Sequence, residues 1–184
     1  MKLDIYQADA FTSKVFGGNP AALVPLDEWL PDQTLLNIAI ENNLSETAFT
    51  VPQGDKYHLR WFTPGGEVQL CGHATLASAW VIFNKLGWQG ERIRLRSKSG
   101  ILGVRQTPEG WLALDFPSLA WQEVPTPELL RQALPEAPDT ALFVPNDTNY
   151  LLTLPSEQAV LDAQPDMRLL KQLGNQGLIV TARG

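Results

Sequence analysis

Residues 61–86 read WFTPGGEVQLCGHATLASAWVIFNKL, and this stretch decides the fold that the sequence predicts. Apolar residues alternate along its first strand, the Pro-Gly-Gly turn at residues 64–66 reverses the chain, and residues 67–71 run back as a second strand. A helix over residues 73–86 follows, in which residues 74–83 include only two polar side chains. Because a helix that is apolar all round is buried, we expect this helix to lie in the core.

The start of this helix is a candidate binding site. Gly72 and His73 open it directly after the second strand. The first backbone N–H groups of a helix have no partner within the helix, and anions bind there. If Gly72 and His73 face a cleft, this end suits a carboxylate or an enolate, and the glycine allows close approach. Alternatively, the preceding strand and local turns satisfy these donors, and the sequence leaves both interpretations open.

The composition is that of a globular, mildly acidic protein. The 184 residues are 44% hydrophobic and carry 14 Lys plus Arg against 20 Asp plus Glu, a formal charge of -6. The densest group of basic residues is Arg92, Arg94 and Arg96. These arginines occupy every second position, the pattern of a strand that has one solvent-facing side. The sequence therefore predicts neither nucleic acid nor membrane as a partner.

Cysteine and histidine are scarce. Cys71 is the only cysteine, which excludes an intrachain disulfide framework. Because the chain has only two histidines, His58 and His73, we also predict no metal site. At the N-terminus, Asp4 and Asp9 fall where a signal peptide needs its apolar region. No segment approaches the ~20 apolar residues of a membrane span. We therefore expect a cytoplasmic protein.

Glu46 is the carboxylate that stands out. It falls in a predicted strand over residues 44–51, among apolar residues and threonines. Glutamate is depleted in strands because its charge must be solvated or paired. If the face that Glu46 shares with Ala48 is the core, Glu46 is a candidate general acid and base. If the strand lies at an edge, Glu46 lies in water.

Asn19 is a weaker candidate. It belongs to the Gly17-Gly18-Asn19-Pro20 segment, which has strong turn chemistry. Because proline holds the preceding residue extended and offers no backbone donor, the amide of Asn19 is free to cap the turn or to meet a ligand.

The order of the elements indicates an internal duplication. The first part has predicted strands over 2–11, 21–25, 44–51, 57–63, 67–71, 92–97, 101–107 and 111–116 and a helix from Pro31 to 42–43. The second has helices over 128–134, 156–163 and 165–173 and strands over 141–145, 149–154 and 178–182, with Thr126 as the cap of its first helix. A proline-rich stretch over 117–127 separates the two parts.

The two parts match in outline, PDQTLL at 31–36 recurring as PDMRLL at 165–170. We expect residues 1–117 to form one half, with 73–86 as its central helix, and residues 118–184 to begin a second half that lacks a central helix. The chain is therefore predicted to be a piece of a protein roughly half as long again.

Four motifs resemble a known family. They are GNPAA at 18–22, NNLSETAF at 42–49, WFTP at 61–64 and EVQLCGHATLA at 67–77. In order and spacing they resemble the phenazine biosynthesis PhzF-like family across the first ~120 residues, and the second part resembles it more loosely. The resemblance implies an α+β fold like that of diaminopimelate epimerase, with two similar halves, each a curved mixed sheet around a central helix, and the active site between them.

The resemblance also implies an activity. Family members are cofactor-independent isomerases that move a proton on a small carboxylate, cyclic ones included, and Glu46 matches the glutamate that takes the proton from one carbon and returns it to another. Gly72 and His73 match the substrate-binding turn, and Asn19 matches the family's loop. A homodimer is implied. The family's second half adds an acidic residue and a Gly-Ser pair, which would lie beyond residue 184.

Cys71 has a separate interpretation. Related epimerases and racemases use a thiol in a similar Cys-Gly context, together with a second thiol on the other half, and this chain has no second cysteine. We therefore expect Cys71 to line the substrate site. It does not easily form a nucleophile and base pair with His73, two positions away. An alternative function is a non-catalytic carboxylate-binding protein on the same scaffold, or an inactive fragment of the isomerase.

Overall fold

The computed structural model describes residues 2–146 and 148–184. The chain divides into two compact units, the first ending at Phe116 and the second running from Pro117 to Gly184. Within the described residues, no helix has the length and apolar character needed to cross a membrane.

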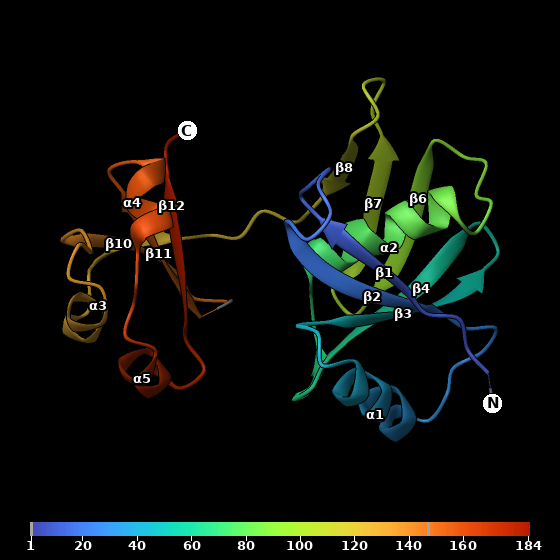
Figure 1. The fold of residues 1–184 in the computed structure, drawn as a ribbon, viewed down its shortest axis with the longest axis horizontal. Helices are drawn as coiled ribbons and strands as arrows, with labels where there is room; N and C mark the ends of the chain where they lie inside the picture. The colour runs from blue at the N-terminus through green and yellow to red at the C-terminus, as the bar shows by residue number, and fades with distance from the viewer. Residues whose placement is uncertain (1, 147) are drawn as a thin grey trace. The chain divides into compact units, whose positions relative to one another are not determined.

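The first unit is a mixed sheet that curls around one helix, α2 (Gly72–Asn84) (Figure 1). Among the described residues its strands are β1 (Tyr6–Ala10), β2 (Asn19–Pro25), β3 (Thr47–Gln53), β4 (Lys56–Thr63), β5 (Gly66–Val68), β6 (Arg92–Ser97), β7 (Gly100–Gln106) and β8 (Leu112–Asp115). The order is β1-β2-β3-β4-β6-β7-β8, and β5 pairs with β4. The β2–β3 and β4–β6 pairs are parallel, and the others are antiparallel.

Both faces of the central strands are buried. On β3 and β4, Ala48 and Trp61 pack in the cluster around α2, whereas their neighbours Phe49 and Phe62 pack in a second cluster with Leu35 of α1 (Asp32–Asn42). This follows from the strand period of two, which sends successive side chains to opposite faces. The sheet is therefore sandwiched between the two helices in this region.

The central helix is buried on most sides but not all round. Ala74, Ala79 and Ile82 are fully buried, whereas Trp80 is 45% exposed. The prediction of complete burial is wrong because the curled sheet encloses only part of the helix. The helix also begins one residue earlier and ends two residues earlier than the predicted range of 73–86. After Asn84, the N–H groups of Lys85 and Leu86 both donate to the carbonyl of Val81.

The second unit is a smaller sheet with short helices. Its strands are β9 (Gln122–Pro125), β10 (Thr140–Val144), β11 (Asn149–Leu154) and β12 (Gly177–Ala182), in the order β12-β11-β10-β9. Its helices are α3 (Glu128–Ala133), α4 (Glu157–Asp162), α5 (Met167–Leu170) and the 3₁₀ helix η1 (Lys171–Leu173). Strand β9 was not predicted. The predicted cap is also wrong, because Pro127 takes the N-cap position and the Thr126 hydroxyl instead donates to the carbonyl of Pro138.

The two units share one connection pattern. In the first, the antiparallel β1–β2 hairpin continues through α1 to β3, which lies parallel to β2. In the second, the antiparallel β10–β11 hairpin continues through α4, α5 and η1 to β12, which lies parallel to β11. This shared topology supports an internal duplication. The assignment of residues 118–184 as the beginning of a second epimerase-like half stays a prediction.

Candidate active site

Glu46 lies immediately before β3, not within the predicted strand over residues 44–51. The helix α1 ends at Asn42, its C-cap Asn43 turns the chain with a left-handed φ of 51°, and the β2–β3 ladder begins only at Thr47. The carbonyl of Glu46 accepts a hydrogen bond from the Ala22 N–H at 3.3 Å. Its backbone is therefore fixed against β2. Its side chain is 19% exposed, so it lies neither in the core nor in open water, the two settings that the sequence predicted.

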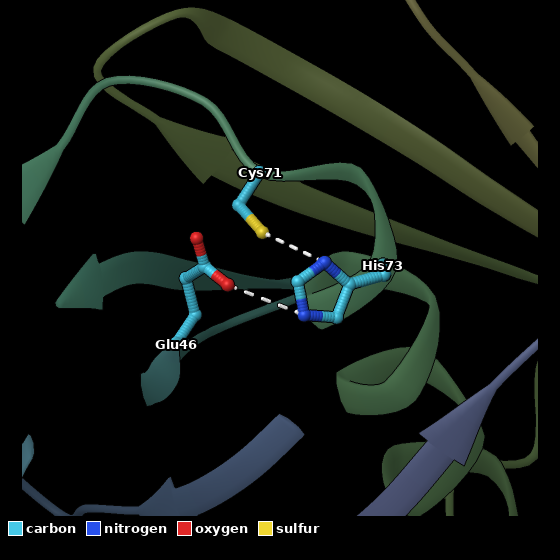
Figure 2. Close-up of side chains that lie close together, drawn as sticks. All are labelled: Glu46, Cys71 and His73. Atoms are coloured by element: carbon cyan, nitrogen blue, oxygen red, sulfur yellow. Dashed lines mark hydrogen bonds and ion pairs between the residues drawn. The ribbon is translucent and has the colours of Figure 1, made fainter. Parts of the chain in front are cut away.

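His73, in the first turn of α2, is the centre of the site. Figure 2 shows the side chains of Glu46 and Cys71 each in contact with one of its two ring nitrogens. His73 Nε2 lies 3.3 Å from Glu46 Oε2, and His73 Nδ1 lies 3.6 Å from Cys71 Sγ. The hydroxyl of Ser45 is a further hydrogen-bonding partner of Nε2, at 3.3 Å. With its side chain only 11% exposed, the imidazole is held in place by groups at both ring nitrogens.

The Oε2 atom of Glu46 is buried and, among the described residues, makes no hydrogen bond. Its contact with His73 has the distance of an ion pair without the alignment of a hydrogen bond. A buried polar atom without a hydrogen bond is uncommon in folded proteins and calls for an explanation, such as a catalytic role. This oxygen is available to accept a proton or to bind a ligand.

Cys71 is a buried thiol at the N-cap position of α2. Burial raises its pKa to about 12, and the nearby Glu46 carboxylate acts in the same direction. The backbone N–H groups of His73 and Ala74 act in the opposite direction, so they face the sulfur, although neither makes a capping hydrogen bond. Because the thiolate is the reactive form of cysteine, this protonated thiol is unsuited to act as a base or a nucleophile at neutral pH.

Gly72 packs against the ring of Phe116. A Cβ atom at this position would lie 3.1 Å from the ring of Phe116, so the glycine permits close packing between α2 and the residue that follows β8. This contact is a structural reason for the glycine that the sequence did not reveal. The proposed role of Gly72 in substrate binding stays a prediction.

Asn19 is the first residue of β2, paired with Ala10, and not part of the turn before the strand. Since β2 and β3 are parallel, both begin at the same end of the sheet, which is also the end where Glu46 lies. The structure thus brings Glu46, Cys71 and His73 together and places Asn19 at the same end. Sequence reasoning missed Ser45, although it lies beside Glu46 in the NNLSETAF motif.

The curled sheet around a single helix defines the class of protein, an α+β fold of the epimerase type. A solved structure of a predicted epimerase from Pseudomonas aeruginosa shares this fold, with a TM-score of 0.66 and 20% identity over 97% of this chain and 70% of that chain. A PhzF-family phenazine biosynthesis protein from Enterococcus faecalis is more similar, with a TM-score of 0.88 and 43% identity over 99% of this chain and 69% of that chain.

Sequence comparison defines the family. The family model for phenazine biosynthesis-like proteins matches residues 8–184. A curated protein from Pseudomonas aeruginosa, called an uncharacterized isomerase, is 47% identical over 100% of this chain and 69% of its own length. This chain belongs to the phenazine biosynthesis-like protein family, which confirms the resemblance inferred from the four motifs.

Proposed function

We propose that this protein is a cofactor-independent isomerase in which Glu46 moves a proton on a small carboxylate substrate. The observation that carries the proposal is the buried Oε2 of Glu46, which has no hydrogen bond within the described residues and lies 3.3 Å from His73. A carboxylate oxygen without a hydrogen bond is free to take a proton from a substrate and to return it. A family member that is called an isomerase supports the same reaction class.

In the proposed reaction Glu46 acts first as a base and then as an acid. It removes a proton from a carbon of the substrate, and the electron pair of that C–H bond spreads into the adjacent unsaturated system. The resulting carboxylic acid then gives the proton to another carbon, so the enzyme ends in its starting state. In this proposal the ring of His73 holds the substrate and stabilises the negative charge of the intermediate. Ser45 and Cys71 hold the ring.

The substrate's carboxylate would be held at the end of the sheet that carries Asn19 and the start of α2. The positive end of the α2 dipole and the amide of Asn19 both suit an anion there. The alternative function is a carboxylate-binding protein without catalysis. His73 and Asn19 are the main contacts that this proposal expects for the substrate's carboxylate.

The test is a screen of small cyclic and acyclic unsaturated amino and hydroxy acids, with the products identified by NMR. Glu46→Gln should lower turnover by a factor of about 10² to 10⁴, the usual contribution of a general acid and base, while binding changes little. The control is Glu41→Gln, which alters an exposed glutamate of α1 and should leave turnover unchanged. Turnover retained by Glu46→Gln would refute the proposal. Binding of an acid without any product would favour the alternative.

A further inference from the structure

The three side chains of the site match the ligands that zinc prefers. Glu46, Cys71 and His73 each offer one ligand atom, and these atoms lie within 4.8 Å of one another. Histidine nitrogen, cysteine sulfur and carboxylate oxygen are the three ligand types of protein zinc sites, and three protein ligands are enough when the fourth position is open. The scarcity of cysteine and histidine predicted no metal site, but the Glu46 carboxylate supplies a third ligand.

Each of the two contacts with His73 has the length of a ligand-to-ligand separation in a tetrahedral zinc site. With Zn–S near 2.3 Å and Zn–N or Zn–O near 2.0–2.1 Å, tetrahedral angles separate sulfur from nitrogen by about 3.6 Å and nitrogen from oxygen by about 3.3 Å. The separation between Cys71 Sγ and His73 Nδ1 is 3.6 Å, and that between His73 Nε2 and Glu46 Oε2 is 3.3 Å. These contacts use different ring nitrogens. One ion binds one nitrogen, so the three ligand atoms, which lie within 4.8 Å of one another, have to move closer by about 1 Å as the ring turns.

The charges of the cluster also suit a divalent cation. Glu46 Oε2 is buried without a hydrogen bond among the described residues, so binding an ion there displaces no existing hydrogen bond. A coordinated cysteine loses its proton to solvent, and the resulting thiolate together with the carboxylate balances the two charges of the ion. The soft sulfur ligand favours Zn²⁺ over a hard cation such as Mg²⁺.

We propose that Glu46, Cys71 and His73 form a binding site for Zn²⁺, which inhibits the protein by occupying its acid and base. The inhibition rests on the proposed function, because a carboxylate that coordinates an ion cannot accept a proton from a substrate. The binding itself does not depend on that function. It requires only the three side chains.

The experiment measures metal binding to the untagged 184-residue chain, with Zn²⁺ affinity taken from competition with a coloured chelator. Co²⁺ serves as a spectroscopic substitute, since a cobalt–thiolate bond gives a charge-transfer band in the near ultraviolet. We expect this band in the native chain and its absence in Cys71→Ser. Glu46→Gln and His73→Asn should each weaken Zn²⁺ binding at least about tenfold, because even residues that only support metal ligands have effects of that size.

His58→Asn is the matched control, since it removes the chain's other histidine and should leave the affinity unchanged. Circular dichroism confirms that each variant is folded. Binding that survives Cys71→Ser, or that is lost equally in His58→Asn, would overturn the proposal. The cobalt spectrum needs no substrate, so failure of the zinc site and failure of the isomerase proposal are separate outcomes.

Discussion

Arg60 and Glu67 face each other across the β4–β5 pair, and both guanidinium-to-carboxylate contacts measure 2.8 Å. The side chains are only 14% and 13% exposed, and Lys98 Nζ adds a contact of 2.6 Å to the same carboxylate. Strand β5 ends three residues before Cys71. The ion pair therefore holds the segment that leads into the candidate active site.

This ion pair should make the stability of the first unit depend on pH. The hydrogen bond from Arg60 lowers the pKa of Glu67 from 4.5 to about 2, Lys98 acts in the same direction, and burial opposes them. A carboxyl group whose pKa is lower in the folded state contributes stability above its unfolded pKa and loses it as the pH falls through the folded pKa. We expect a loss of up to about 3 kcal/mol between pH values of about 4.5 and 2.

Urea unfolding at a series of pH values, followed by tryptophan fluorescence, measures this loss. Five of the six tryptophans precede Phe116, so fluorescence reports mainly on the first unit. Glu67→Gln should be less stable at pH 7 and should lack most of the acid-dependent loss. Asp115→Asn removes an exposed ion pair with Arg92 and should change stability by less than about 1 kcal/mol. Parallel pH profiles for Glu67→Gln and the unaltered chain would contradict the prediction.

Cys71 should react slowly with thiol reagents in the folded protein. Burial raises its pKa to about 12, whereas an unfolded cysteine titrates near 8.5, so the thiolate fraction near pH 8 falls by about three orders of magnitude. The measurement is the rate of reaction with Ellman's reagent in buffer and in concentrated urea. Because Cys71 is the chain's only cysteine, the signal has a single source. Equal rates in the two solvents would show an accessible, ionised thiol.

Gly18 should tolerate a side chain poorly. Its φ is 68°, and a Cβ atom there would overlap the carbonyl oxygen of Ala10, at the end of the hairpin that carries Asn19. Gly54 has a similar φ of 62° but open space around it. Gly54→Ala should therefore cost about 1 kcal/mol of unfolding free energy from backbone strain alone. Gly18→Ala should cost about 2 kcal/mol more, because the clash is with backbone.

Urea unfolding of the two variants tests this comparison, and the difference between them isolates the clash because the backbone strain is common to both. Equal losses of stability would mean that the β1–β2 connection yields easily around residue 18. In that case the position of Asn19 would also be less firmly set.

Local patterns predicted much of the fold. The alternation of Arg92, Ile93, Arg94 and Leu95 is reproduced in β6, where the arginines are exposed and the apolar residues are buried. The end of α1 was also predictable, because Asn43 is one of the few residue types that readily adopts the left-handed conformation. Such features depend on residues close in sequence, and these are the relationships that periodicity and capping rules describe.

Features that depend on distant partners were missed. Strand β9 has three exposed residues of four and ends in Pro125, so it exists only through its pairing with β10. Glu46 was predicted within a strand, but the partner strand β2 sets where the ladder begins. The contact between Glu46 and His73 joins residues 27 positions apart, and a single sequence has no rule for the side-chain geometry that results.

Two residues of α2 should differ sharply in their contribution to stability. Ile82 is fully buried against the curled sheet, whereas Trp80, two positions earlier, is 45% exposed. Lys85 Nζ lies over the ring of Trp80, 5.8 Å from the ring centroid. Ile82→Ala should cost about 2 to 5 kcal/mol, since it leaves a cavity in the core. Trp80→Ala should cost about 1 kcal/mol or less, the scale of an exposed cation–π contact. Circular dichroism is the suitable probe because Trp80→Ala removes a fluorophore. A larger loss for Trp80→Ala would show that its side of α2 is covered in solution.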